Sequence, residues 1–331
     1  MKSEIKVAML GMGNMGCKHA NHLRKLPGVR IAALCARNRE AAQEYNRASG
    51  TDYPVYEDFD RMLEAEPFDA LYICLPPFAH TGQLEKAARR GVHIFAEKPI
   101  ALDVQRGAGM VEAVAQGGVK SQMGYHMRFG GAVARLMELV HSGAAGRPTL
   151  YSAHFECNSL HKRWWRDVHK SGGQVLEQII HLYDMALYTM GDAARVAGFA
   201  DTLCHGDVPD YTAEDTSAVS IRFQNGALGA ITGSNCAIPG RWNSGFHIVF
   251  ENLVADFTDH NHGRLVFTKE ENREELLDFD TDVFFAENEY FMAVIRGEKP
   301  EIAPIGEGFK GLALTAAALR SSKEGGAAIT L

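Results

Sequence analysis

A glycine-rich segment near the N-terminus constrains the fold of this chain more than any other feature. Residues 11–16 read Gly-Met-Gly-Asn-Met-Gly, which is the pattern G-x-G-x-x-G. The segment follows a continuous apolar run at residues 5–10 and opens a helical pattern at residues 15–26. In this context the first glycine permits a tight turn, the second lets backbone approach a pyrophosphate, and the third lets helix and strand pack closely. The free N–H groups of the helix then face the anion. The sequence therefore predicts a dinucleotide-binding loop, with a ligand-free glycine turn as the alternative.

The rest of the first 120 residues alternates strand and helix patterns. We expect strands at residues 29–35, 70–75, 92–96 and 119–124, and helices at residues 39–48, 81–90 and 103–115. Repeated βαβ units of this kind predict a Rossmann domain, a doubly wound parallel sheet of the α/β class.

The second half of the chain has a different pattern. Strand patterns dominate, and Asn225-Gly226 is a strong hairpin signal between two of them. Expected strands are residues 149–157, 217–223, 227–234, 246–250, 253–257 and 265–268, and expected helices are residues 132–141, 173–190, 282–296 and 307–321. We predict an α+β domain with a large, mostly antiparallel sheet. A chain of 331 residues also favours two domains, which we place at residues 1–122 and 123–331.

Bulk properties exclude several classes of partner. A formal net charge of −7 argues against nucleic acid, and no apolar run is long enough to span a membrane. The six cysteines are scattered, so a disulfide framework is not expected and a reducing, cytoplasmic setting fits. Asp256, Asp259, His260 and His262 match no standard ligand spacing, and we predict no metal.

The residues after the second strand bear on the choice of dinucleotide. NAD-binding domains usually carry an acidic residue there, which accepts a hydrogen bond from the ribose 2′-OH. This chain has Ala36 and Arg37, with Arg39 close by. The arginines can donate to a 2′-phosphate, so we favour NADP slightly over NAD, although both side chains can also be ordinary solvated residues.

Two further segments carry candidate chemistry. Lys98, in Glu97-Lys98-Pro99, follows a predicted parallel strand, and ligands bind outside that edge of such sheets. Glu177, His181 and Asp184 lie on one stripe of a predicted helix that is otherwise mostly apolar. A histidine held by carboxylates suits general acid–base catalysis. A lysine leaving its strand for water and a satisfied core histidine are the alternatives.

These segments together resemble the glucose-fructose oxidoreductase / inositol dehydrogenase / MocA family over nearly the whole chain. The matching motifs are the glycine loop followed by His19, Pro76-Pro77 with His80, Glu97-Lys98-Pro99, residues 124–129, Trp165-Arg166-Asp167, Ser171-Gly172-Gly173, the Glu177–His181–Asp184 segment, Glu214-Asp215-Thr216 and Asn225-Gly226.

The resemblance implies a Rossmann domain followed by an α/β domain whose open sheet often packs against another subunit. It also implies that Lys98 and His181 flank the reacting carbon, supported by Glu177. The expected cofactor-binding residues are Gly11, Gly13, Asn14, Met15, Gly16, Ala36, Arg37, Leu75, Pro76, His80, Glu97 and Lys98. The expected substrate-binding residues are Lys98, Tyr125, His126, Arg128, Trp165, Arg166, His181 and Asp184.

We therefore expect an NAD(P)-dependent oxidoreductase that moves a hydride to or from a hydroxyl-bearing carbon of a sugar, polyol or glycoside. The expected assembly is a homodimer or homotetramer. Two alternatives stay open. One is a redox-neutral enzyme that cleaves or epimerises a glycosidic substrate with its cofactor bound, and the other is a non-catalytic dinucleotide-sensing regulator.

Overall fold

The computed structural model describes residues 4–271 and 273–331, which divide into two compact units. The first unit takes the residues up to 101, residues 105–126 and residues 282–309, and the second takes residues 102–104, 127–281 and 310–331. This differs from a single boundary at residue 122. Residues 282–309 return to the first unit and include Phe291, Met292 and Val294. These three side chains lie in its apolar core with Met9 and Leu23. Burial of these side chains is what joins the segment to that unit.

The first unit is built on a six-stranded sheet in which every neighbouring pair is parallel. The strands are β1 (Ile5–Leu10), β2 (Val29–Cys35), β3 (Val55–Tyr56), β4 (Ala70–Ile73), β5 (His93–Ala96) and β6 (Ser121–Met123). Their order, β3-β2-β1-β4-β5-β6, reverses direction between β1 and β4. The predicted doubly wound sheet is confirmed, and its switch point lies beside the glycine loop.

The helices of the first unit follow the predicted pattern with two additions. They are α1 (Asn14–Leu23), α2 (Arg39–Ser49), α3 (Phe59–Ala65), α4 (Gln83–Arg89), α5 (Val104–Gly117) and α11 (Val283–Arg296). Helix α3 and strand β3 were not expected from the sequence. A capping bond defines the start of α3, where the Asp58 side chain accepts from the backbone N–H of Arg61.

The second unit holds a nine-stranded sheet whose neighbouring pairs are antiparallel except for β7 with β10. Its strands are β7 (Pro148–Glu156), β8 (Ala193–Asp201), β9 (Thr216–Phe223), β10 (Leu228–Ser234), β11 (Asn243–Phe250), β12 (Leu253–Phe257), β13 (His262–Phe267), β14 (Arg273–Asp278) and β15 (Ile329–Thr330). The predicted mostly antiparallel sheet is confirmed. Strand β14, with the sequence REELLD, has too little apolar character to be recognised before its pairing with β13 is known.

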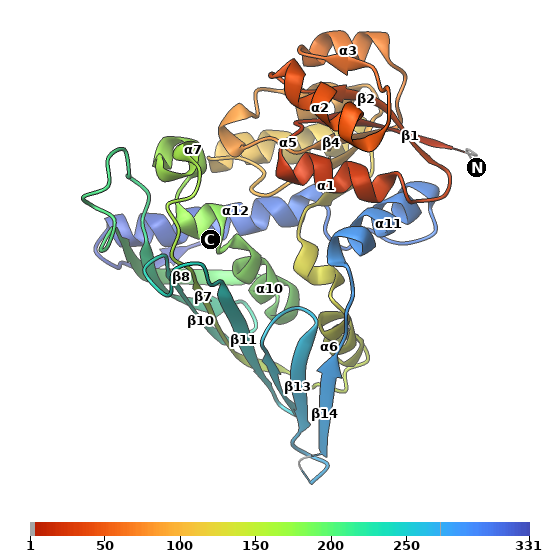
Figure 1. Cartoon of the computed structure of the whole chain (residues 1–331). Coiled ribbons are helices and arrows are strands. Elements are labelled where there is room, and N and C mark those ends of the chain that lie inside the picture. Colours follow the sequence, from red (N-terminus) through yellow and green to blue (C-terminus); the bar gives the residue numbers. More distant parts are fainter. Residues whose placement is uncertain (1–3, 272) are drawn as a thin grey trace. The chain divides into compact units, whose positions relative to one another are not determined.

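One face of this large sheet is covered and the other is open. Residues along β9 and β10 alternate strictly between buried and exposed. The buried side chains join those of α6 (Gly131–His141), α10 (Ile180–Met190) and α12 (Ile305–Lys323) in one core. Figure 1 shows α10 lying along the sheet. The open face keeps exposed apolar side chains, including Leu150 and Leu228.

The helix predicted at residues 173–190 is interrupted in the structure. Helix α9 (Gln174–Glu177) ends before Gln178, and α10 begins at Ile180. The backbone N–H of Ile179 bonds to the carbonyl of Gln174, five residues back, which is the wide spacing of a local bulge. A continuous helical stripe through Glu177 and His181 was therefore wrong, because the two residues belong to different helices.

Two further expectations can be compared with the structure. None of the described helices is both long enough and apolar enough to cross a membrane. A disulfide joins Cys204 to Cys236, 32 residues apart, whereas the sequence favoured a reducing setting. The bond links the segment after β8 to the segment after β10.

Candidate functional site

Four predicted cofactor-binding segments lie at the carboxyl edge of the parallel sheet. Gly11 follows β1, Ala36 follows β2, Leu75 comes shortly after β4, and Glu97 follows β5. Backbone bonds hold these turns to neighbouring strands: the N–H of Gly11 donates to Cys35 O at 2.8 Å, and that of Glu97 to Ile73 O at 2.9 Å. This is the edge at which open α/β sheets bind ligands.

The three glycines of the loop differ in the space that surrounds them. Gly11 has φ +94°, and a Cβ on it would lie 2.5 Å from Cys74 O. A Cβ on Gly16 would lie 1.9 Å from Gly11 O, whereas a Cβ on Gly13 would meet no heavy atom of the protein within 4 Å. Gly11 and Gly16 are thus required by the protein's own packing, and Gly13 leaves open space before the helix.

That open space fits a dinucleotide phosphate. Gly13 and Asn14 are exposed, and Gly13 caps α1 with an extended backbone while making no side-chain bond to its first turn. Asn14 and Met15 are the first residues of this ten-residue helix, whose N-terminal amides have no acceptor within the helix. The residues present therefore suit the diphosphate of NAD or NADP.

Ala36, Arg37 and His80, all predicted to lie near the dinucleotide or close to its turns, differ in exposure and charge. Ala36 is buried, and Arg37 beyond it is exposed, so neither residue directly after β2 is acidic, although Asp58 lies close enough to act on Cys35. His80 is buried, with its Nε2 atom 3.4 Å from Leu75 O. Burial lowers the pKa of His80 to about 4, so its imidazole is neutral at pH 7. It therefore braces the turn at Leu75 and Pro76.

The Lys98 turn rests on a buried carboxylate. Lys98 is partly buried, its peptide bond to Pro99 is cis, and its amide N–H donates to Glu97 Oε2 at 3.2 Å. Glu97 Oε1 lies 2.9 Å from His19 Nε2. Burial opposes ionisation of Glu97, but the hydrogen bond with His19 and the charge of Lys98 bring its pKa below the ordinary value.

Tyr125 and His126 belong to the same unit and follow β6. Tyr125 is fully buried, and the imidazole of His126 stacks on Phe284 with ring centroids 4.8 Å apart. Arg128, another residue predicted to bind substrate in the same short segment, lies in the second unit.

Arg128 and Asp184 are bound to each other. The guanidinium donates to Asp184 through Nη2 at 2.6 Å and Nε at 3.0 Å, and both side chains are almost fully buried. The Arg128 guanidinium also lies over the ring of Tyr188, 4.3 Å from its centroid. Such a buried bidentate pair fixes both side chains in place. Whether either of them contacts substrate, as the resemblance implies, stays a prediction.

Glu177 and His181 are both partly buried, so each keeps some exposed surface that a ligand can contact. Glu177 Oε2 accepts a hydrogen bond from the indole Nε1 of Trp165 at 2.8 Å. Trp165 is itself buried against Tyr211 and Ala213. The indole N–H therefore holds Glu177 in place, and the direct substrate contact expected of Trp165 stays a prediction.

An aromatic group next to Trp165 includes Trp242, which the sequence did not single out. The ring centroid of His161 is 4.2 Å from that of Trp165 and 5.4 Å from that of Trp242. Trp242 is 58% exposed, and His161 has φ +51°, an uncommon value for a residue with a Cβ. Arg166, predicted to bind substrate, donates to the carbonyls of Leu160 and His161 and holds this segment. Trp242 comes from a loop more than 70 residues away, so no local pattern pointed to it.

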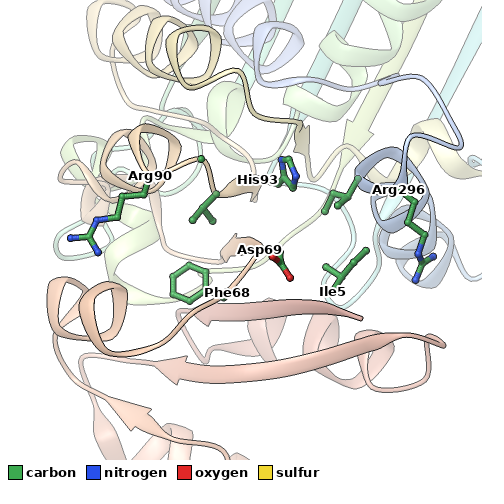
Figure 2. Close-up of a pocket in the computed structure, with 9 residues that line it drawn as sticks. Ile5, Phe68, Asp69, Arg90, His93 and Arg296 are labelled. Atoms are coloured by element: carbon green, nitrogen blue, oxygen red, sulfur yellow. The ribbon is translucent and has the colours of Figure 1, made fainter. Parts of the chain in front are cut away.

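A well-defined pocket lies elsewhere in the first unit. It has a volume of about 330 Å³ and is lined by Ile5, Phe68, Asp69, Arg90, Gly91, Val92, His93, Ile295 and Arg296. Ile5 and His93 begin their strands, so this pocket is at the amino edge of the sheet, opposite the glycine loop. In Figure 2 the labelled Arg90 and Arg296 point away from its centre. It does not contain any predicted site residue.

Comparison with known protein families shows which family has this arrangement of domains. Residues 5–125 match the oxidoreductase family with an NAD-binding Rossmann fold, and residues 133–253 match the GFO/IDH/MocA C-terminal domain. The chain belongs to this family. The predicted resemblance and the predicted enzyme class, an NAD-binding oxidoreductase, are thereby confirmed.

Individual relatives are similar over most of the chain. Scyllo-inositol 2-dehydrogenase (NAD(+)) of Bacillus subtilis is 27% identical over 91% of this chain and 89% of its own length. Inositol 2-dehydrogenase of Rhizobium meliloti is 27% identical over 97% of both chains. Among solved structures, the WlbA dehydrogenase of Bordetella pertussis in complex with NADH and UDP-GlcNAcA aligns with a TM-score of 0.84 and 23% identity over 99% of both chains. This last likeness concerns the fold.

Proposed function

We propose that the protein is an NAD(P)-dependent dehydrogenase or reductase acting on a hydroxyl-bearing carbon of a sugar, polyol or glycoside, with Lys98 and His181 as its acid–base pair. The observation that carries the proposal is the Glu97–Lys98 turn at the same sheet edge as the glycine loop. The substrate class is supported by relatives named inositol 2-dehydrogenase.

The proposed chemistry divides between the dinucleotide and the protein. When bound, the nicotinamide accepts or gives the hydride. His181 takes the hydroxyl proton during oxidation, because an imidazole with a pKa near ~6.5 exchanges protons at neutral pH. Lys98 donates a hydrogen bond to the same oxygen and stabilises the charge that develops there. Glu177, oriented by Trp165, holds a neighbouring hydroxyl or His181 itself.

The substrate is bounded on one side by the aromatic group of His161 and Trp242. Ring faces suit the C–H faces of sugars, and exposed Trp242 offers such a face.

A panel of aldoses, polyols and glycosides, each supplied with NAD and with NADP, tests this function. We expect sustained growth of absorbance at 340 nm with at least one member of the panel. Product formed without net NAD(P)H would instead identify the redox-neutral alternative, and tight dinucleotide binding with no product from any member would favour the regulator.

We further propose that NADP is slightly favoured, because Ala36 stands where an acidic residue would hold the ribose 2′-OH and Arg37 follows it as a donor to a 2′-phosphate. Titration of the wild type with both dinucleotides should give the lower Kd for NADP. Arg37→Ala should weaken NADP binding and leave NAD binding nearly unchanged, whereas Arg89→Ala, an exposed arginine on α4, should affect neither. A lower Kd for NAD in the wild type would reject this preference.

A further inference from the structure

Four polar side chains are buried together behind the Lys98 turn. His19 comes from α1, Glu97 from the end of β5, and Glu287 and Asn288 from α11. His19, Glu287 and Asn288 have no exposed surface, and Glu97 is 7% exposed. Burying charge is costly, so it matters which of these two carboxyl groups and one imidazole carry a proton.

The hydrogen bonds of Asn288 fix the tautomer of His19. The amide Nδ2 of Asn288 is 2.9 Å from His19 Nδ1 and also donates to Phe284 O. His19 Nδ1 is also 3.3 Å from Asn288 Oδ1, but Nδ2 is the nearer atom and an amide nitrogen only donates, so we take Nδ1 as the acceptor and place the ring proton on Nε2. That proton is directed at Glu97 Oε1, 2.9 Å away. Glu97 therefore receives two donors, His19 Nε2 and the amide of Lys98.

Glu287 receives no comparable donor. Neither carboxyl oxygen has a hydrogen-bond partner among the described residues, and Oε1 is 3.9 Å from His19 Nε2. The adjacent strand β4 contributes Tyr72 and Cys74, which are uncharged at neutral pH. An ionised carboxylate in this position would have lost its water without gaining a hydrogen bond.

Burial and most of the charges near Glu287 disfavour its ionised form. Burial first and the negative charge of Glu97 second raise the pKa of Glu287 well above its ordinary value. Lys18 on the surface of α1 opposes this shift, and Asp282 at the start of α11 adds to it. Two carboxyl groups this close to one imidazole share protons as a unit.

We propose that Glu287 is a positioning residue for the Lys98 turn: a neutral carboxylic acid whose proton limits the buried cluster to one negative charge, that of Glu97. The inference rests on the proposed function, in which Lys98 does the chemistry. With Glu287 neutral, the Nε2–H of His19 is directed at Glu97 alone, and Glu97 is free to hold the amide and face the ammonium of Lys98. A second negative charge would compete for the His19 proton and loosen this arrangement.

A divalent cation is the competing occupant of the cluster. One ligand atom from each of His19, Glu97 and Glu287 lies within 4.8 Å of the others, a spacing that a metal ion also accepts. The 2.9 Å hydrogen bond between His19 and Glu97 favours the proton, because a metal would require Nε2 to be unprotonated.

Infrared difference spectroscopy of the full chain tests the proton directly and without turnover. Wild type minus Glu287→Gln, at pH 7, should show the carbonyl stretch of one protonated carboxylic acid. Glu57→Gln, which changes an exposed acid of the same unit, should show only the bands of a carboxylate. Elemental analysis of the wild type should find no metal in a one-to-one ratio with the chain.

Kinetics then test the positioning role. Glu287→Gln, which matches the neutral acid in shape, should keep kcat/KM and its pH profile close to wild type. Glu287→Ala should lower kcat by about 10- to 100-fold, as misplacement of a catalytic group does, with little change in dinucleotide Kd.

Three results would overturn the proposal: no carboxylic acid band, one bound metal that is lost in Glu287→Gln, or a Glu287→Gln enzyme as impaired as Glu287→Ala. If no sugar or polyol is turned over by the wild type, the proposed function fails while the infrared result still decides the state of Glu287.

Discussion

Gly13 differs from the other two glycines of its loop because the protein itself leaves room for a side chain there. Gly13→Val should therefore fold normally, as its φ of −84° is accessible to valine. The added methyl groups would occupy the space in front of α1, so we expect dinucleotide Kd to rise at least about tenfold, or 1.4 kcal/mol. Calorimetric titration measures this, with the melting temperature as the check on folding. An unchanged Kd would mean that the phosphates bind elsewhere.

Glu214 gives the stability of the protein a pH dependence of its own. Burial raises its pKa from 4.5 to about 7, while its Oε1 accepts from the backbone N–H of Val175 at 2.7 Å. Because the folded state holds this proton more tightly, its contribution to the free energy of unfolding is complete below pH 4.5 and is lost as pH rises to about 7.

Chemical denaturation of the wild type and of Glu214→Gln between pH 4.5 and 8 measures this effect. Relative to the variant, the wild type should lose up to about 3 kcal/mol across that interval, since one pKa unit corresponds to 1.36 kcal/mol. Glu57→Gln, an exposed acid, should track the wild type. A constant difference between wild type and Glu214→Gln would show that Glu214 ionises normally.

Residues whose role depends on local context were predictable from the sequence. The glycine loop and Lys98 lie at the predicted sheet edge because their strands precede them directly. Glu287 and Asn288 were not predictable, because their partners are remote: Asn288 meets His19 across 269 residues. Likewise, nothing in the sequence around Trp165 shows that its indole N–H donates to Glu177.

At the scale of elements, the interruption between α9 and α10 coincides with a tight contact that local helix propensity does not contain. Ile179, in the break, is fully buried, and a Cβ on Gly233 of β10 would lie 2.0 Å from its Cδ1 atom. The helical periodicity of residues 173–190 predicted one helix because it records which side chains are apolar, and it carries no information about what they pack against.

A double-mutant cycle measures this contact. Gly233→Ala should cost about 1–3 kcal/mol, as overpacking does, and much less in an Ile179→Val background, because valine lacks the Cδ1 atom. Gly229→Ala on the same strand is the matched control, since its Cβ would meet Phe223 and should not couple to Ile179→Val. Equal costs of Gly233→Ala in both backgrounds would remove Ile179 as the cause.

The parallel strands of the first unit were easier to predict than the strands of the second. Strands such as Ile5–Leu10 are buried on both faces, so their continuous apolar sequence is enough to indicate a strand. Strands β8 and β14 present one exposed face, with Phe199 and Leu276 on it, and become strands through pairing with distant segments. Residues 282–309 join the first unit through packing against distant residues of its core, which no local pattern indicates.

For the whole molecule, the open face of the nine-stranded sheet is the main surface without an explanation inside one chain. Leu150, Leu228, Phe199 and Leu276 on its strands are 41–78% exposed. Exposed apolar surface of this kind favours a homo-oligomer. Sedimentation at micromolar concentration should show a dimer or tetramer, and Leu228→Arg should shift it toward monomer while Phe78→Arg, in the first unit, should not. A monomeric wild type would refute the expected assembly.

The central claim is that Lys98 and His181 carry the chemistry together, and single-turnover kinetics of their variants test it most directly. On the substrate found in the panel, Lys98→Met and His181→Ala should each lower the rate by about 10²–10⁴-fold, the usual contribution of a general acid or base. Dinucleotide Kd should change little. The double variant should lose less than the product of the two single losses, because both groups act on one oxygen. Near-normal turnover by His181→Ala, or fully multiplicative losses, would contradict the account.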